Sequence, residues 1–335
     1  MIKRVALMLI CCLSMTCLSA CREQAGGSEP EFVFRYAENQ ADGFPTTMAG
    51  KFFAERVKAL TNGRIEIIVY PDEALGDESS VIEQLQFGGI DFSRLNLSPL
   101  AELDERYYAL QLPYLYDSGE HMWRVLDGDI GAEYLKITED LGLVGLSWMD
   151  AGARSFYTSA PVCGLSDMAN MRIRVQENTL MLRLVESLGA NPQMLRYGAV
   201  LSALQTGEIG GAENNIPSYL SMGHYLVARY FLEDEHTRIP EMVVASHVTM
   251  EKLSPDDRAI IQSAATEAGL YQREAWLAYE KQAREQIRKS GGSIIALSPE
   301  ARESFRAAVS VIYDEFAADP DAQRTIQAIR DLRRY

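Results

Sequence analysis

The sequence predicts an α/β protein of two domains, each with a sheet covered by helices. Three observations favour this class. Strand and helix patterns alternate along residues 31–96, as in a parallel sheet with helices on its faces, and the alternation returns after residue 142. The chain has 335 residues, which is enough for two domains of ordinary size. Finally, residues 255–289 form an uninterrupted helical pattern that would extend for about 50 Å, longer than one small domain.

The first half of the chain contains three predicted strands and two predicted helices. These are the strands 31–40, 64–71 and 90–96 and the helices 46–63 and 78–89. In parallel sheets, ligands bind beyond the carboxyl ends of the strands. Here those ends carry Asn39 and Gln40, then residues 72–77, and then residues 94–96.

The second half repeats this alternation. Its predicted elements are a strand at 142–150, a strand at 171–176, a helix at 179–189, a helix from 198 that gives way to a turn and a loop by 215, a strand at 241–250, the helix 255–289, the segment "SIIALS" at 293–298 and a helix at 299–317. The helix 255–289 has its only proline at its first position, so nothing in it predicts a break. We therefore expect this helix to tie two domains together.

The chain is acidic, with a formal net charge of −15. This balance argues against nucleic acid as a partner, because phosphate binding needs a basic surface. An anionic ligand would have to be held by a few local cations.

The N-terminus carries a predicted export signal. Lys3 and Arg4 precede an apolar run that ends in "LSAC", and small residues before a cysteine resemble a bacterial lipoprotein cleavage box. This resemblance implies that residues 1–21 hold the signal peptide and lipobox, with cleavage before Cys21, lipidation of its thiol and a membrane anchor. A plain secretory signal with an incidental cysteine is the alternative. Residues 22–30 are polar and indicate a flexible tether.

Motifs of common enzymes and metal sites are missing from the sequence. It contains no GxGxxG, GxxxxGK[ST], HExxH or GxSxG, and its four histidines lack metal-ligand spacing. We interpret "EDEH" at 233–236 as a solvated loop in an acidic chain, not as a metal cluster. Cys163, the only cysteine after Cys21, is expected to be a small buried hydrophobe. No metal or cofactor is predicted.

Cationic and amide side chains near predicted strands are the remaining candidates for a site. Arg154 follows a strand, Arg172 and Arg174 alternate along another, and Asn214 and Asn215 follow "GGAE" in a predicted loop. A guanidinium presents a planar fork of donors that matches a carboxylate. A solvated or salt-bridged position is the expected alternative for a lone strand arginine, and we keep it for Arg172.

Several long segments resemble the solute-binding subunit of TRAP transporters, the dicarboxylate-binding DctP-type family. They include "GRIEIIVYPDEALGDESSVIEQLQFGGIDF", "GARSFYTSAPV", "MRIRVQEN", "ALQTGEIGGAENN" and "SPDDRAIIQSAA", and the resemblance runs from about residue 31 to beyond 290. It implies a two-domain, periplasmic-binding-protein-like α/β fold with hinge strands and one long helix spanning both domains. We expect the first domain to comprise 31–151 plus about 240–275, and the second 152–239 plus about 276–335.

The resemblance also assigns candidate ligand-binding residues. It implies that Arg174 forms a bidentate salt bridge to the ligand carboxylate, that Arg154 lies near it and that Asn214 supports it. Candidates from the first domain are Asn39, Gln40, Asp77, Arg94 and Asn96. Two positions depart from the family pattern: Gly210 replaces an Asp, which could loosen the loop holding Asn214, and Ala199 replaces a Glu, which we expect to alter only helix packing.

The candidate side chains favour a hydroxylated organic acid as the ligand. They combine acids, amides and arginine, and buried hydroxyl groups need paired donors and acceptors. The set also resembles that of sugar-acid-binding members, so we expect a hexuronate such as glucuronate or galacturonate and the membrane subunits of a TRAP transporter as partners. Trp148 and Tyr157 could stack on a sugar face or simply pack in the core. A C4-dicarboxylate or other carboxylate ligand, a secreted enzyme acting on acidic sugars, and a sensor remain alternatives.

Overall fold

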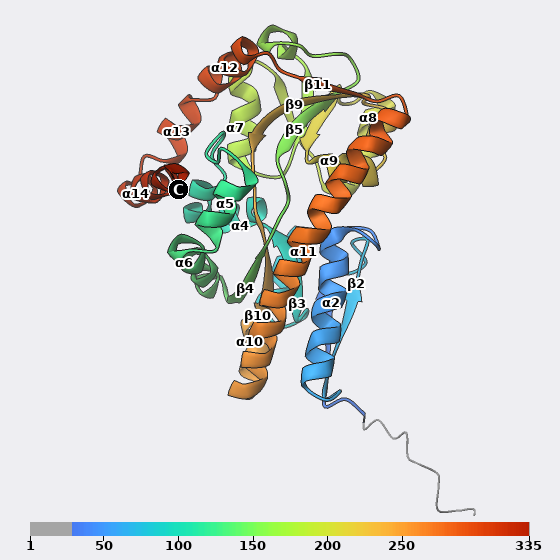
Figure 1. Cartoon of the computed structure of the whole chain (residues 1–335), viewed down its shortest axis with the longest axis vertical. Helices are drawn as coiled ribbons and strands as arrows, with labels where there is room; N and C mark the ends of the chain where they lie inside the picture. The colour runs from blue at the N-terminus through green and yellow to red at the C-terminus, as the bar shows by residue number, and fades with distance from the viewer. Residues whose placement is uncertain (1–28, 335) are drawn as a thin grey trace, which may run out of the picture.

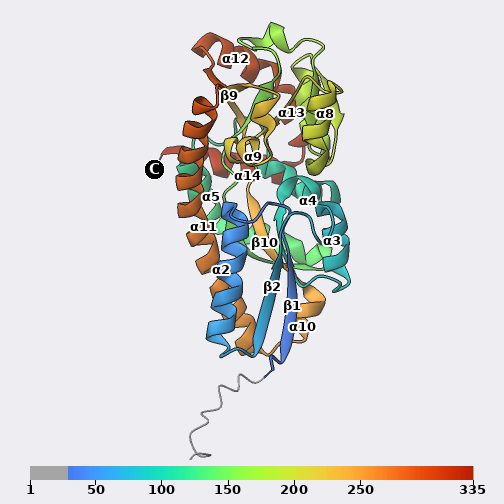
Figure 2. The same ribbon diagram turned by 90° about the vertical axis from the view of Figure 1, so that its right-hand side faces the viewer.

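The computed structural model describes residues 29–334 of the chain. The predicted signal peptide, the lipidation site Cys21 and most of the tether lie outside these residues. Two sheets, one in each domain, follow each other along the long axis of the molecule (Figures 1 and 2). The predicted two-domain α/β class is therefore confirmed.

The first sheet has five strands in the order β2-β1-β3-β10-β4. Their bounds are β1 Phe32–Ala37, β2 Ile65–Tyr70, β3 Phe92–Asn96, β4 Leu143–Met149 and β10 Glu241–Ser246. β1 pairs in parallel with β2 and β3, as the alternation predicted, but β10 runs antiparallel to β3 and β4. The sheet is mixed because its last two strands carry the chain to and from the second domain.

The second sheet has six strands in the order β11-β9-β5-β8-β6-β7. Their bounds are β5 Arg154–Thr158, β6 Arg172–Val175, β7 Asn191–Met194, β8 Gly211–Asn214, β9 Tyr230–Thr237 and β11 Ser293–Ala296. β6 is parallel to β7 and β8, whereas β5 is antiparallel to β8 and β9. Each sheet thus has parallel strands together with antiparallel strands that carry the chain between the two domains.

The helices cover the sheets and close the ends of the molecule. They are α2 Pro45–Leu60, α3 Glu78–Gln86, α4 Leu97–Leu103, η1 Glu105–Leu110, α5 Gly119–Leu126, α6 Asp129–Ile137, η2 Thr138–Leu141, η3 Leu165–Met168, α7 Thr179–Ser187, η4 Tyr197–Ala199, α8 Val200–Thr206, α9 Ile216–Ser221, η5 His224–Leu226, α10 His247–Glu251, α11 Pro255–Lys289, α12 Pro299–Ala308, α13 Val311–Phe316, α14 Pro320–Asp331 and η6 Leu332–Arg334. The apolar spacing of α2 places Phe53 and Val57 in the core beside Phe92 of β3. Within residues 29–334, no helix is both long and apolar enough to cross a bilayer.

Three predicted elements differ from the structure. The helix expected from 198 ends with α8, because Gly207 adopts a left-handed backbone (φ 71°), and residues 211–214 then form β8 where a loop was predicted. The strand expected at 241–250 becomes α10 after Ser246. The helix expected at 299–317 is two helices, α12 and α13, and α14 follows them.

The long helix α11 runs over Pro255–Lys289, as predicted, and spans both domains (Figure 1). It packs on α2 and β4 of the first domain and on α9 and β11 of the second. Its single glycine, Gly269, lies against β4, where an added Cβ would come within 2.8 Å of the Trp148 carbonyl oxygen. Glycine costs helix stability, but here it permits this close approach.

Two strand crossings and α11 form the hinge between the domains. The chain passes from β4 to β5 through residues 150–153 and returns from β9 to β10 through 238–240. Gln272 of α11 is buried; its Nε2 donates to the Asp150 carbonyl oxygen and its Oε1 accepts from the Asp150 amide, both at 2.8 Å. The predicted hinge strands are confirmed. The boundaries of the domains stay a prediction, and α14 contacts η1 across one of them.

Candidate functional site

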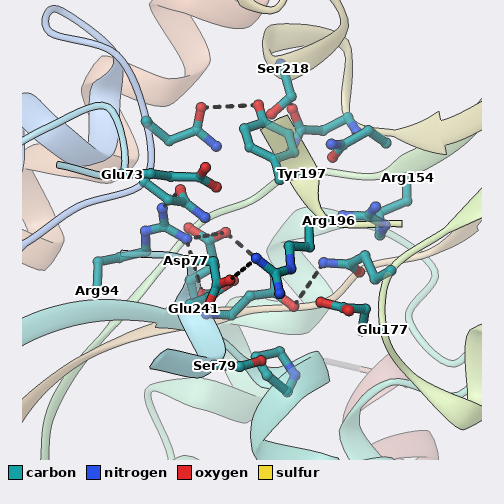
Figure 3. A pocket seen from close by; sticks show the side chains of 18 of the residues that line it. Glu73, Asp77, Ser79, Arg94, Arg154, Glu177, Arg196, Tyr197, Ser218 and Glu241 are labelled. Atoms are coloured by element: carbon teal, nitrogen blue, oxygen red, sulfur yellow. Dashed lines mark hydrogen bonds and ion pairs between the residues drawn. The ribbon is translucent and has the colours of Figure 1, made fainter. Parts of the chain in front are cut away.

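A polar pocket lies between the two sheets, where strands of both domains end (Figure 3). It encloses about 70 Å³ and is lined by Asn39, Gln40, Glu73, Asp77, Glu78, Ser79, Arg94, Asn96, Pro99, Arg154, Arg174, Gln176, Glu177, Arg196, Tyr197, Asn214, Asn215, Ser218 and Glu241. All eight predicted ligand-binding residues are in this set. That they contact a ligand stays a prediction.

Strand topology explains why these residues meet. In the second sheet, β6 and β8 run in parallel and bring Arg174 level with Ala212, so that their carboxyl ends lie together. In the first sheet, Asn96 at the carboxyl end of β3 lies opposite Glu241 at the start of antiparallel β10. The pocket therefore lies at the strand ends of both sheets, the usual position for ligands in open α/β folds.

Arg174 is buried in the pocket wall with its charge unpaired. Its Nε and Nη2 both donate to the Leu195 carbonyl oxygen, at 2.9 and 2.7 Å, and its residue exposure is 3%. Arg94 and Arg154 are the other buried arginines among residues 29–333, and each forms ion pairs, whereas Arg174 forms none in this part of the chain. Burial lowers the pKa of Arg174. The side chain is thus a desolvated cation without a carboxylate partner.

Arg154 is neutralised by a buried network. Its Nε and Nη2 bind both carboxylate oxygens of Glu213, at 2.6 and 2.9 Å. Behind Glu213 lies His236, whose Nδ1 is 2.9 Å from Asp234. Burial alone would raise the pKa of Glu213, but Arg154 and His236 hold it at about 2; Asp234 and Glu213 raise the pKa of His236 to about 9 against the opposing effect of burial.

The solvated-loop interpretation of residues 233–236 was therefore wrong. Asp234 and His236 belong to β9 and are buried, at 0% and 1% exposure. Their charges alternate with those of Glu213 and Arg154, which explains how four ionisable groups share one interior region. The metal-cluster alternative finds no support, since no group of metal-ligating side chains is seen within residues 29–334.

Arg94 lies on the opposite side of the pocket from Arg154 (Figure 3). It forms ion pairs with Glu38, Glu78 and Glu241, and its Nη2 also donates to Asn39. One guanidinium thus faces three carboxylates. Burial, opposed by the attraction of Arg94, raises the pKa of Glu78 to about 7.

Residues between β7 and α8 connect the two domains across the pocket. Arg196 forms an ion pair with Asp77 at 2.9 Å, and the Tyr197 hydroxyl donates to Gln40 at 3.1 Å. Gln176, at the end of β6, donates to Asn96 at 3.4 Å. In this structure the domains therefore contact each other directly over the pocket.

Asn214 ends strand β8 and does not lie in a loop. Its Oδ1 accepts a hydrogen bond from the Asn215 amide at 2.8 Å. The backbone of Gly210 is held on both sides: its amide donates to the Arg172 carbonyl and its carbonyl accepts from the Ser159 amide. That its departure from the family pattern loosens the segment holding Asn214 stays a prediction. Ala199 is exposed before α8, so its side chain has little packing to alter.

The sequence did not reveal several pocket residues, among them Glu78, Arg196, Tyr197 and Glu241. Glu241 was missed because a parallel sheet was expected, and only in an antiparallel strand does the first residue reach the ligand edge. Arg196 and Tyr197 follow the short strand β7, which the pattern did not predict. Pro240, directly before Glu241, was the sequence signal that a strand starts at Glu241.

Three minor predictions have clear outcomes. Trp148 and Tyr157 pack in the core, with the Trp148 Nε1 donating to Gly131 and the Tyr157 hydroxyl 2.8 Å from His224, so the core-packing alternative is confirmed. Cys163 was expected to be buried but is exposed. It precedes the surface turn of η3, where its amide donates to Asp167.

The fold and pocket are those expected of a solute-binding protein. The model of the DctP family, described as bacterial extracellular solute-binding protein, family 7, matches residues 36–319. The chain belongs to this family.

Relatives of known sequence and structure agree with this assignment. A "Solute-binding protein" of Chromohalobacter salexigens is 35% identical over 292 residues, covering 87% of this chain and 86% of the relative. A TRAP periplasmic solute-binding protein from Bradyrhizobium sp. BTAi1, solved with galacturonate, superposes with a TM-score of 0.86 at 37% identity, covering 89% and 99% of the two chains. One from C. salexigens with bound D-glucuronate has a TM-score of 0.86 at 34% identity, covering 89% and 99%.

Proposed function

We propose that this protein captures a hexuronate, such as galacturonate or glucuronate, outside the cytoplasm and delivers it to the membrane subunits of a TRAP transporter. Arg174 holds the carboxylate of the solute, and polar side chains of the first domain bind its hydroxyl groups. The solved relatives with bound hexuronates support this choice of solute.

The single observation that carries the proposal is the unpaired charge of Arg174. A buried cation without a counter-ion destabilises the protein unless a partner arrives. Because the Leu195 carbonyl accepts from Nε and from Nη2, the guanidinium is held in one orientation, while its Nη1 donates to no protein group within residues 29–334. A solute carboxylate would complete the site and gain a charge-assisted hydrogen bond.

Release of the solute requires the domains to separate. The two crossings near Asp150 and residues 238–240 are the natural hinge, and the direct contacts of Arg196 and Tyr197 with the first domain would break on opening. The solute is bound between the domains, so it favours the closed form, which the membrane subunits would recognise.

We further propose that lipidation of Cys21 holds the protein at the membrane. The support is the sequence "LSAC" after an apolar run. Cys21→Ser should abolish incorporation of labelled fatty acid and release the protein from the membrane fraction. Unchanged labelling of this variant would reject the anchor.

A thermal-shift screen over hexuronates, C4-dicarboxylates and keto acids tests the proposed solute. A ligand at 100 times its dissociation constant stabilises the native state by about 2.7 kcal/mol. Galacturonate or glucuronate should raise the melting temperature at micromolar to millimolar concentration, and succinate should not. If only succinate raises the melting temperature, the solute is a dicarboxylate and the proposal of a hexuronate is wrong.

A further inference from the structure

The first-domain end of the pocket has more acceptors than donors. Resting on the hexuronate function proposed above, we infer that this end is an acceptor subsite, in which Glu78 and Glu241 bind hydroxyl groups of the solute and exclude a second carboxylate. The protein would then select sugar acids with one carboxylate over those with a carboxylate at each end.

Arg94 does not offer free donors to a ligand. Its Nε donates to Glu38 at 3.1 Å, its Nη1 donates to Glu241 at 3.2 Å, and its Nη2 donates to both Glu38 and Asn39. The remaining Nη1 hydrogen lies on the side of Glu78, whose Oε1 is 3.5 Å away. A second carboxylate of the solute could pair with Arg94 only by displacing one of these partners.

Two of the acids beside Arg94, Glu78 and Glu241, each use only one carboxylate oxygen as an acceptor of hydrogen bonds from residues 29–334. Glu241 Oε1 accepts from Arg94 and from Asn96 Nδ2, and Glu78 Oε1 accepts from the Asn96 amide at 2.5 Å. Within residues 29–334, no protein group donates to Oε2 of either acid, although both side chains line the pocket. Both oxygens can be reached from the pocket, since neither is among the buried polar atoms without a partner. A solute that fills the pocket would displace water from them, and an acceptor left without a donor is then costly. The solute should therefore bring donors, and hydroxyl groups are the neutral donors of a sugar acid.

The charges of this end oppose a further anion. Glu38, Glu78 and Glu241 share the single positive charge of Arg94, and Glu73 lies beside them. The pKa of Glu241 and the pKa of Glu73 are raised, mainly by burial. The unpaired cation Arg174 belongs to the second domain, so the charge distribution fixes the direction of the solute, with its carboxylate toward Arg174 and its hydroxyl groups toward Glu241.

Calorimetry with three related acids tests this subsite. Galacturonate is the reference, L-galactonate is the open-chain acid made by reducing its aldehyde carbon, and galactarate carries a carboxylate at that carbon. The last two differ only in the second carboxylate. We expect L-galactonate to bind about 100-fold more tightly than galactarate, because like charges brought together in a binding site cost several kcal/mol.

Variants show whether the acids cause this difference. At pH 8, above the pKa of about 7 of Glu78, Glu78→Gln and Glu241→Gln each remove one charge at nearly constant shape and should reduce the ratio about tenfold. Glu83→Gln is the matched control, because Glu83 is exposed on the same helix α3 and outside the pocket; it should leave the ratio unchanged. Thermal melts show whether each variant is folded. If Glu241→Gln, which changes the more buried residue, does not fold, Glu78→Gln alone provides the test.

The possible outcomes separate this inference from the proposed function. Equal affinities of the wild type for L-galactonate and galactarate, or a ratio that neither glutamine variant changes, would overturn the acceptor subsite alone. If the pocket binds only the ring form of a sugar acid, the two open-chain acids will not bind, and the affinity for galacturonate becomes the test. Glu78→Gln and Glu241→Gln should then each weaken galacturonate binding about tenfold. Wild-type affinity for galacturonate in both variants would overturn the inference. Failure of the wild type to bind any of the three acids, and glucuronate as well, would overturn the proposed function itself.

Discussion

At the scale of single residues, the pocket assigns different tasks to its three buried arginines. Arg94 and Arg154 are paired with acids on the two walls, whereas Arg174 donates only to the Leu195 carbonyl among residues 29–334 and, in the proposed function, pairs with the solute carboxylate. The three side chains are chemically identical, so the position of each arginine and the chemistry of its neighbours determine whether it is paired with an acid.

Arg174→Lys should bind hexuronates poorly although it keeps the positive charge. An ammonium group cannot hold Leu195 and a carboxylate together in the planar fork of a guanidinium, so we expect a loss of about 2–5 kcal/mol in binding free energy. Calorimetry with galacturonate measures it. Arg172→Lys, on the exposed end of the same strand, is the control and should bind normally. Wild-type affinity in Arg174→Lys would show that charge alone suffices.

Residue-scale prediction from the sequence succeeded where local pattern and family motif agreed. The alternation in "MRIRVQ" placed Arg172 and Arg174 two residues apart, and the structure exposes the first and buries the second. The sequence could not show which acids would neutralise Arg94 and Arg154. Glu241 lies 147 positions from Arg94 along the chain, and only the antiparallel pairing of β10 brings the two together.

At the scale of elements, α11 and the crossing at Asp150 connect the domains. Gln272→Leu keeps the volume of the side chain but leaves the amide and carbonyl of Asp150 without partners, since Gln272 occupies both. We expect the free energy of unfolding to fall by about 2–4 kcal/mol, the cost of two unpaired buried groups. Urea unfolding measures this change. Gln282→Leu, at an exposed position of the same helix, should be nearly neutral, and equal effects of the two would argue against the proposed hinge contact.

The segment between β7 and α8 closes over the pocket through Arg196. Its ion pair with Asp77 is largely exposed on the arginine side, and exposed pairs contribute about 0–1 kcal/mol. Arg196→Gln should therefore speed solute dissociation by up to about fivefold, and added salt should reduce the difference between variant and wild type. Stopped-flow measurements of release test this. Arg183→Gln is the control, because Arg183 forms surface ion pairs with Glu186 and Glu315 and does not line the pocket. An Arg196→Gln rate equal to wild type would show that the ion pair does not hold the domains closed.

Element prediction was most accurate for the longest uninterrupted pattern. The helix at 255–289 was predicted with its observed bounds because Ser254 caps it, Pro255 starts it and nothing interrupts it. Short strands such as β7 and β8 have four residues each, too few for a clear period. The region after α8 is a further example. Gly207 could be recognised in the sequence as a helix end, but the four-residue strand β8 that follows could not be predicted.

At the scale of the whole molecule, buried ionisable groups make stability depend on pH. The pKa of His236 is raised from 6.5 to about 9, so its contribution is fully present below pH 6.5 and is lost as the pH rises through 9. The pKa of Glu213 is lowered from 4.5 to about 2, so its contribution is present above pH 4.5 and is lost as the pH falls through 2. The pKa of Glu78, raised to about 7, adds a loss of stability between pH 4.5 and 7.

We therefore expect the free energy of unfolding of the ligand-free protein to decrease between pH 6.5 and 9. Denaturant unfolding at several pH values measures this trend, and His236→Gln should flatten it, because glutamine cannot hold the proton between Asp234 and Glu213. His247→Gln provides the control, since His247 is exposed. A decline of the same size in His236→Gln would assign the effect to other groups.

The most direct test of the account combines the solute carboxylate with Arg174 in one calorimetric cycle. Galacturonate and galactose, which lacks the carboxylate, are titrated into the wild type and into Arg174→Ala. The wild type should prefer galacturonate by about 2–5 kcal/mol in binding free energy, and the variant should lose most of that preference. If Arg174→Ala still prefers galacturonate as strongly as the wild type does, the carboxylate binds elsewhere and the proposed arginine clamp is wrong.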